Sequence, residues 1–142
     1  FDAGAEAGHR RITHSKDPGR IARKAYTYIH VLIVGGVIVS AVADELALVH
    51  PDEASFAGIS ALLGGPILYL LGNALFKWVS SDRAAPPLSH LLGILIILAL
   101  IPMAYGRLYA PLTLACITSC VLVLVAVWEH MALRRPAPEL DP

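Results

Sequence analysis

The sequence predicts an all-α, polytopic membrane protein: a transmembrane bundle of four membrane-spanning helices with both termini on the cytoplasmic side. Three observations lead to this prediction. Hydrophobic residues make up 56% of the chain, four long stretches lack charged residues, and Lys and Arg gather on one side of those stretches. Soluble domains are about 45–50% apolar, so the placement of the apolar residues matters more than their total.

Each uncharged stretch is long enough to cross a bilayer. The four are Ala25–Ala43, Ala54–Phe76, Ala84–Gly106 and Leu108–Trp128. A helix rises ~1.5 Å per residue, so about 20 residues cross a hydrocarbon core of roughly 30 Å. Lipid admits only helices or closed barrels, and the period-2 alternation of barrel strands is missing. We therefore expect helices over residues 18–49, 56–79, 88–105 and 111–133.

Local signals place the ends of the first helix. Asp17 can cap it, Pro18 suits its first position because the missing N–H would be unpaired there, and His50-Pro51 ends it. The resulting organisation has three parts, namely a polar, basic cytoplasmic linker (1–17), a transmembrane region (18–135) and a polar tail (136–142). No secretory signal precedes the first span and the sequence starts at Phe1, so we expect a piece of a longer protein.

The orientation follows from the positive-inside rule. Of the 11 Lys and Arg residues, all but Arg107 fall in the N-terminal segment, around the loop between the second and third helices, or at the C-terminus. Cytoplasmic loops carry an excess of these residues, so that side is predicted to be cytoplasmic. Glu129, near the cytoplasmic end of the fourth helix, could meet Lys77 or Arg135 there.

Several function classes lack support in the sequence. The formal net charge is zero, which gives no basic field for nucleic acid. Cys116 and Cys120 lie one turn apart in an apolar run and are interpreted as packing residues, and the histidines show no metal-ligand spacing such as HExxH. No hydrolase, P-loop or dinucleotide pattern is present. We expect no catalytic residues, no metal and no cofactor.

The clearest polar pattern lies on the first helix. Residues spaced alternately by four and three form one stripe along it: Tyr26, His30, Ile33, Val37, Ser40 and Asp44. Polar groups inside a membrane are costly and suggest a function, here a path for a proton or cation. The alternative is helix packing, because Gly36, Ser40 and Asp44 also fit a contact face of small residues.

A second polar group lies on the second helix. Tyr69, Asn73 and Lys77 follow Gly64-Gly65-Pro66 at four-residue spacing, and Pro66 favours a kink. Antiparallel helices bring Asn73 to the depth of His30, so Tyr69, Asn73, His30 and Tyr26 could form a binding cluster. A kink without any ligand is the alternative.

The outer side offers one predicted ion pair. Asp44 and Glu45 lie near the outer interface, where Arg107 is the one predicted cation. A pair between Arg107 and either acid would offset the desolvation of both groups. Hydrated, unpaired acids are the alternative.

The first two helices resemble a known family. The run Asp17-Pro18-Gly19-Arg20-Ile21-Ala22-Arg23-Lys24-Ala25-Tyr26-Thr27-Tyr28-Ile29-His30, continued by Gly35-Gly36 and His50-Pro51, resembles the bacterial low temperature requirement protein A (LtrA) family. Gly65-Pro66, Tyr69, Gly72, Ala74 and Phe76 fit the same pattern. The resemblance implies a multi-spanning protein of the bacterial cytoplasmic (inner) membrane with further helices upstream. It supplies no binding or catalytic residues.

Two functional hypotheses remain from the sequence. The first is an LtrA-type protein that moves a proton, an ion or a small solute. The second is a structural or accessory subunit whose helices pack against a larger membrane complex. In both, the expected partners are the lipid bilayer and further transmembrane helices of a longer chain or a neighbouring complex.

Overall fold

The computed structural model describes residues 27–80 and 86–133, and within these ranges every regular element is a helix. The helices are α3 (Ile29–Val49), α4 (Phe56–Ser80), α5 (Leu88–Tyr105) and α6 (Pro111–Leu133). Each is long and apolar enough to cross a membrane, which confirms the predicted all-α fold with four spans. The bounds of α5 and α6 coincide with the predicted ranges. The predicted helix start at Pro18, the linker and the tail lie outside the described residues.

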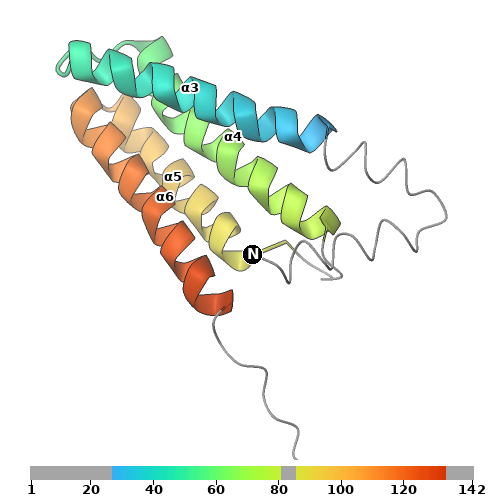
Figure 1. Ribbon diagram of the computed structural model, residues 1–142. Coiled ribbons are helices and arrows are strands. Elements are labelled where there is room, and N and C mark those ends of the chain that lie inside the picture. The colour runs from blue at the N-terminus through green and yellow to red at the C-terminus, as the bar shows by residue number, and fades with distance from the viewer. Residues whose placement is uncertain (1–26, 81–85, 134–142) are drawn as a thin grey trace, which may run out of the picture.

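Successive helices run in opposite directions (Figure 1). Two turns, residues 50–55 and 106–110, therefore lie at the same end of the bundle, which we call the turn end. The other end, which we call the opposite end, holds the last turns of α4 and α6 and the first turns of α3 and α5. Under the positive-inside rule, the opposite end is the predicted cytoplasmic side.

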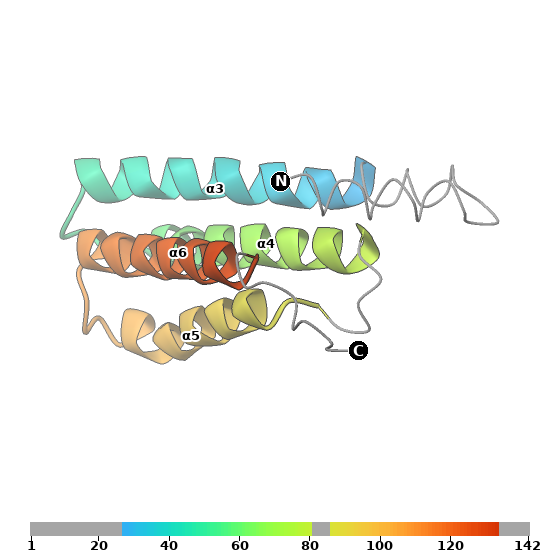
Figure 2. The same ribbon diagram turned by 60° about the horizontal axis from the view of Figure 1, so that its bottom comes forward.

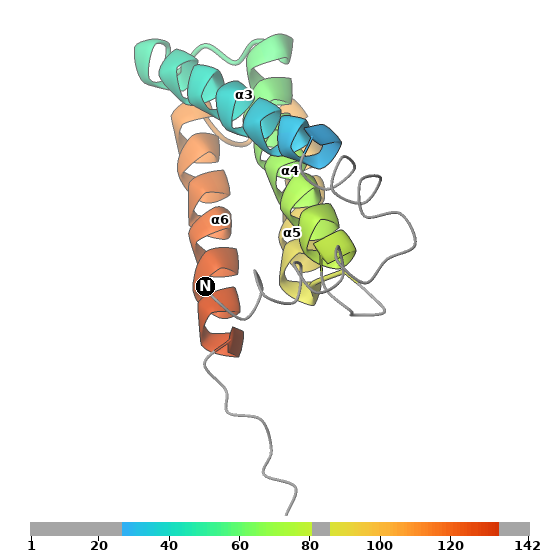
Figure 3. The ribbon, with the colours of Figure 1, turned by 45° about the vertical axis from the view of Figure 1, so that its right-hand side comes forward.

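Helix α4 is the centre of the bundle. It contacts each of the other three helices. Figure 2 shows α3 on one side and α5 on the other, with α4 and α6 between them, and Figure 3 shows α3 crossing over α4. Most of the apolar core lies among α4, α5 and α6, where Leu70, Ile97 and Leu114 are almost fully buried, and Ala43 and Ala47 of α3 also belong to it.

Glycines set the close approach of α3 to α4. A Cβ atom on Gly36 would lie 2.5 Å from the backbone nitrogen of Tyr69, and one on Gly65 would lie 2.7 Å from that of Ser40. A Cβ on Gly72 would likewise lie 3.0 Å from the nitrogen of Ile33. Small residues let backbones approach closely in membrane helix pairs. Gly36 and Ser40, two of the small residues in the contact face expected from the sequence, therefore lie against α4.

Both turns close with local hydrogen bonds. The Ser55 hydroxyl accepts a hydrogen bond from the Gly58 N–H at 3.0 Å, which caps the start of α4. At the end of α5, the N–H of Arg107 donates to Ala104 and that of Leu108 to Met103, the bonds of a Schellman motif. Arg107 occupies the left-handed position of this motif, with φ 55°. Glycine usually fills that position because it has no Cβ, yet Gly106 stands one residue earlier.

The outer surfaces of the helices are apolar. Large hydrophobic side chains are exposed on all four, among them Val31, Leu95 and Leu124. Soluble monomers rarely expose apolar surface on this scale. Lipid is therefore the solvent that fits this exterior, and the protein is a membrane protein.

Candidate functional site

The buried stripe of α3 is displaced by one residue from the predicted polar stripe. The buried residues are Ile29, Gly36, Ala43 and Ala47. His30 and Val37 follow Ile29 and Gly36 directly and are exposed, whereas Asp44 is half-buried. One residue corresponds to a rotation of roughly 100° about the helix axis. His30 and Asp44 thus lie on the flank of α3, beside its contact with α4, and Tyr26 lies outside the described residues.

Ser40 belongs to the contact with α4. Its hydroxyl would lie 2.6 Å from a Cβ atom on Gly65, and it is buried without a hydrogen-bond partner in the described part of the chain. This placement matches the packing alternative for Ser40.

The two polar residues of α4 differ in their surroundings. Tyr69 presses its backbone against Gly36. The side-chain amide of Asn73 donates to the carbonyl of Tyr69 at 2.9 Å, within the same helix. Between residues 27 and 80, no hydrogen bond joins His30 to either of them, so the predicted cluster is not assembled through direct contacts here.

The predicted outer ion pair is not formed. Asp44 and Glu45 belong to α3, whereas Arg107 extends from the α5–α6 turn with an exposed side chain. The ion pairs among the described residues join other groups. All three residues lie near the turn end of the bundle, but residues at the same end need not be in contact.

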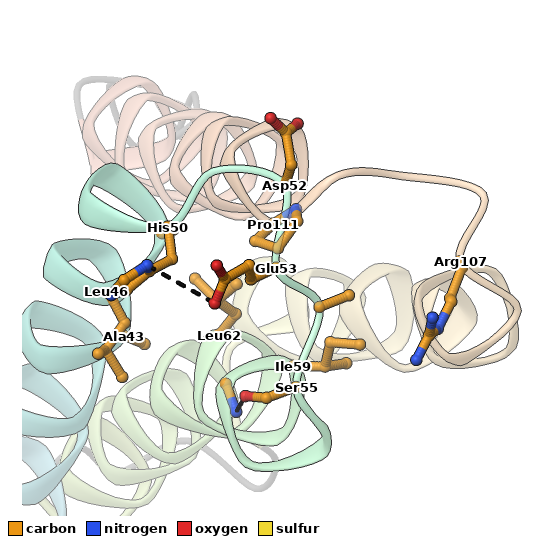
Figure 4. A pocket seen from close by; sticks show the side chains of 13 residues that line it. Ala43, Leu46, His50, Asp52, Glu53, Ser55, Ile59, Leu62, Arg107 and Pro111 are labelled. Atoms are coloured by element: carbon orange, nitrogen blue, oxygen red, sulfur yellow. Dashed lines mark hydrogen bonds and ion pairs between the residues drawn. The ribbon is translucent and has the colours of Figure 1, made fainter.

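A cavity opens at the turn end instead (Figure 4). Its volume is about 450 Å³, and α3, both turns and the first residues of α4 and α6 line it. Apolar side chains, including Ala43, Ile59 and Leu62, form part of the lining. His50, Glu53 and Arg107 also line it, and His50 Nδ1 lies 3.6 Å from a Glu53 carboxylate oxygen.

A cluster of ionisable side chains joins three helices at the opposite end. Lys77 of α4 donates a hydrogen bond to the Glu129 carboxylate of α6. His90 of α5 lies beside this pair, with Nε2 3.5 Å from Lys77 Nζ and 3.8 Å from Glu129 Oε2. Its Nδ1 lies 3.1 Å from the Ser89 hydroxyl. The His90 side chain is 4% exposed, against 35% for Lys77 and 23% for Glu129.

The sequence identified only part of this cluster. The expected contact between Glu129 and Lys77 is confirmed, whereas His90 was grouped with histidines that lack ligand spacing. His90 stands at the third position of α5, level with the ends of α4 and α6. That shared depth is the signal that could have drawn it into the cluster.

An apolar layer closes the bundle next to this cluster. A Cβ atom on Gly93 would lie 2.7 Å from the Val125 side chain and 3.0 Å from that of Leu70. Val121 and Ile97 continue the layer and are buried. Among the described residues of α6, Thr118 is the only buried polar side chain farther from this end of the bundle. Its hydroxyl donates hydrogen bonds to carbonyls of its own helix. The core among α4, α5 and α6 therefore offers no continuous polar route.

Comparisons with known proteins agree with the resemblance seen in the sequence. The family model described as "Bacterial low temperature requirement A protein (LtrA)" matches residues 1–127. The chain is similar to "Uncharacterized protein RA0937" of Rhizobium meliloti (strain 1021), at 35% identity over 138 residues. The match covers 94% of this chain and 32% of the relative, so this chain spans about a third of that protein's length. No solved structure matches significantly.

Proposed function

Since this chain belongs to the bacterial low temperature requirement A (LtrA) family, we propose that it is a structural helical unit of a larger LtrA protein in the bacterial cytoplasmic membrane. In this proposal, the polar flank of α3 packs against further transmembrane helices. The length of the Rhizobium meliloti relative, about three times the matched region, leaves room for such helices.

The observation that carries the proposal is the position of the acids on α3. Asp44 is half-buried and Glu45 is exposed, both inside a span of 21 residues, and neither has an ion-pair partner among the described residues. A carboxylate facing lipid is costly, and such groups normally face protein or water. A neighbouring helix that supplies a hydrogen-bond donor would remove that cost.

The same flank supports a second candidate function, the movement of a proton, an ion or a small solute along α3. His30 is exposed at one end of this flank and Asp44 lies near the other. Histidine exchanges protons near neutral pH. Because the core among the other three helices is apolar, a path along α3 fits better than one through the bundle.

One set of variants in the full-length protein separates the two candidates. Asp44→Asn and His30→Ala are reconstituted in proteoliposomes, and both pH-dependent flux and thermal unfolding are measured. Packing predicts that Asp44→Asn lowers the unfolding free energy by roughly 1–3 kcal/mol, the cost of losing a charge-assisted hydrogen bond. Translocation predicts lost flux in a protein of unchanged stability.

The control is Asp52→Asn, which removes an exposed acid in the turn after α3. It should change neither readout. If Asp44→Asn leaves the stability unchanged or raises it, Asp44 has no protein partner and the packing proposal fails. Unchanged flux in both variants removes His30 and Asp44 from any transport path.

A further inference from the structure

The cavity at the turn end is independent of the α3 flank. It lies where two pairs of helices emerge from the membrane, and its volume of about 450 Å³ is within the range of small-ligand sites, roughly 300–1,000 Å³. Its lining is amphipathic. Ala43, Ala47, Ile59 and Leu62 supply apolar surface, and charged side chains from the two turns supply the rim.

The charges on the rim have opposite signs and come from different turns. Glu53 belongs to the α3–α4 turn and lies beside His50, while Arg107 comes from the α5–α6 turn across the cavity (Figure 4). The Asp52 carboxylate points away from that of Glu53 in the same view. Arg107 has no ion-pair partner among the described residues, so its guanidinium is available to an anion.

These features complement a ligand that has an anionic group, an ammonium group and an apolar tail. A guanidinium binds phosphate well, often through two hydrogen bonds. A carboxylate accepts the N–H bonds of a primary ammonium. We propose that this cavity binds the ethanolamine-phosphate headgroup of an aminophospholipid, with Arg107 at the phosphate, Glu53 at the ammonium and the first acyl carbons over the apolar lining.

The backbone at Arg107 is consistent with such a role. Its left-handed conformation costs an arginine roughly 1–2 kcal/mol relative to the usual helical region. Residues held in such regions are found preferentially at ligand sites and switch regions. Gly106 stands next to the position where a glycine would avoid the cost.

Lipid titration followed by native mass spectrometry tests the proposal on the full-length protein in detergent. The probes are dioleoyl phosphatidylethanolamine, phosphatidylcholine and phosphatidylglycerol. We expect phosphatidylethanolamine to bind roughly tenfold more tightly than phosphatidylcholine, whose methylated ammonium cannot donate N–H bonds to Glu53. Phosphatidylglycerol should also bind more weakly, because it has no ammonium group.

Variants assign the two ends of the headgroup. Glu53→Gln should reduce the preference for phosphatidylethanolamine over phosphatidylcholine. Arg107→Gln should weaken both lipids, and Arg107→Lys, which keeps the positive charge but loses the paired hydrogen bonds of the guanidinium, should weaken them less. The matched control is Glu45→Gln, an exposed acid of α3 outside the cavity lining, which should leave all affinities unchanged. Circular dichroism verifies that every variant is folded.

Three results would overturn the proposal. The first is equal binding of the three lipids, and the second is an Arg107→Gln variant that binds like the wild type. The third is displacement of the lipid by soluble phosphoethanolamine at similar concentrations, which would assign the cavity to a free solute rather than to a membrane lipid.

Discussion

The contact between α3 and α4 depends on glycines, which carry only a hydrogen atom where other residues carry a Cβ. Gly36 faces the backbone of Tyr69 so closely that even a methyl group would overlap it. Gly64, two turns away along α4 from Gly72, faces open space instead. Two glycines in neighbouring helices therefore have opposite roles, and the difference lies only in the direction in which each one faces.

Replacing Gly36 with Ala should destabilise the protein. The added methyl group would lie 2.5 Å from a backbone nitrogen, which cannot rotate away as a flexible side chain could. Overpacking of this kind typically costs about 1–3 kcal/mol. Thermal unfolding in detergent measures the loss.

The matched control for this change is Gly64→Ala. A Cβ atom there would meet nothing within 4 Å, and alanine is the better helix former by up to about 1 kcal/mol. Its stability should equal or exceed that of the wild type. A Gly36→Ala protein as stable as Gly64→Ala would show that α3 does not pack on α4 this closely.

The faces of α3 could not be predicted from spacing alone. The polar stripe through His30 and Asp44 and the buried stripe through Ile29 and Ala43 repeat with the same period and differ by one residue. Both contain small residues. The contact with α4 uses both stripes, because Gly36 of the buried stripe meets Tyr69, whereas Ile33 and Ser40 of the polar stripe meet Gly72 and Gly65.

At the scale of the elements, one ionisable cluster connects three of the four helices. Lys77, His90 and Glu129 come from α4, α5 and α6, and their contacts lie at the opposite end, outside the apolar layer around Gly93. The pair is only partly exposed, so water screens it less than a surface ion pair. We expect it to hold the end of α6 against α4.

A double-mutant cycle measures this coupling. Glu129→Gln, Lys77→Met and the double variant are compared with the wild type by unfolding in mixed micelles. Exposed ion pairs contribute about 0.2–1 kcal/mol. Because the Lys77–Glu129 pair is partly shielded and has His90 beside it, we expect a coupling energy near the upper end, about 1 kcal/mol.

The His50–Glu53 pair provides the reference for that measurement. Its side chains are 52% and 79% exposed and three residues apart in one turn. Glu53→Gln should therefore change the unfolding free energy by less than about 0.5 kcal/mol. If the Lys77–Glu129 cycle gives no coupling beyond this value, the cluster does not stabilise the helix end.

Helix positions were largely predictable, whereas contacts between helices were not. The uncharged runs placed α4, α5 and α6 within one residue of their observed bounds, and His50-Pro51 placed the end of α3. Depth in the membrane also follows from the sequence, which is why Glu129 and Lys77 were paired. Which helices are neighbours does not, and so the turn-end cavity and the separation of Arg107 from Asp44 were missed.

At the scale of the whole molecule, the bundle has an asymmetric arrangement of helices. Helix α4 is the most buried span, while α3 is attached mainly through α4 and has the least buried span. A helix held along one side only leaves most of its surface to lipid or to other helices. The proposed packing of further transmembrane helices against α3 would cover this surface.

The orientation of the bundle remains a prediction from the distribution of Lys and Arg. In the full-length protein, the turn end should face outward and the loop of residues 81–85 should face the cytoplasm. Cys116, Cys120 and any cysteine elsewhere in the full-length protein are replaced by Ala to give a background without thiols, and single cysteines are then introduced as Asp52→Cys or Asp82→Cys. An impermeant maleimide added to intact cells should label residue 52 only. Residue 82 should react after the membrane is opened, because its loop carries Arg83 and follows Lys77. Labelling of residue 82 in intact cells would show that the bundle has the opposite orientation. The proposed aminophospholipid cavity would then lie at the inner leaflet and not at the outer one.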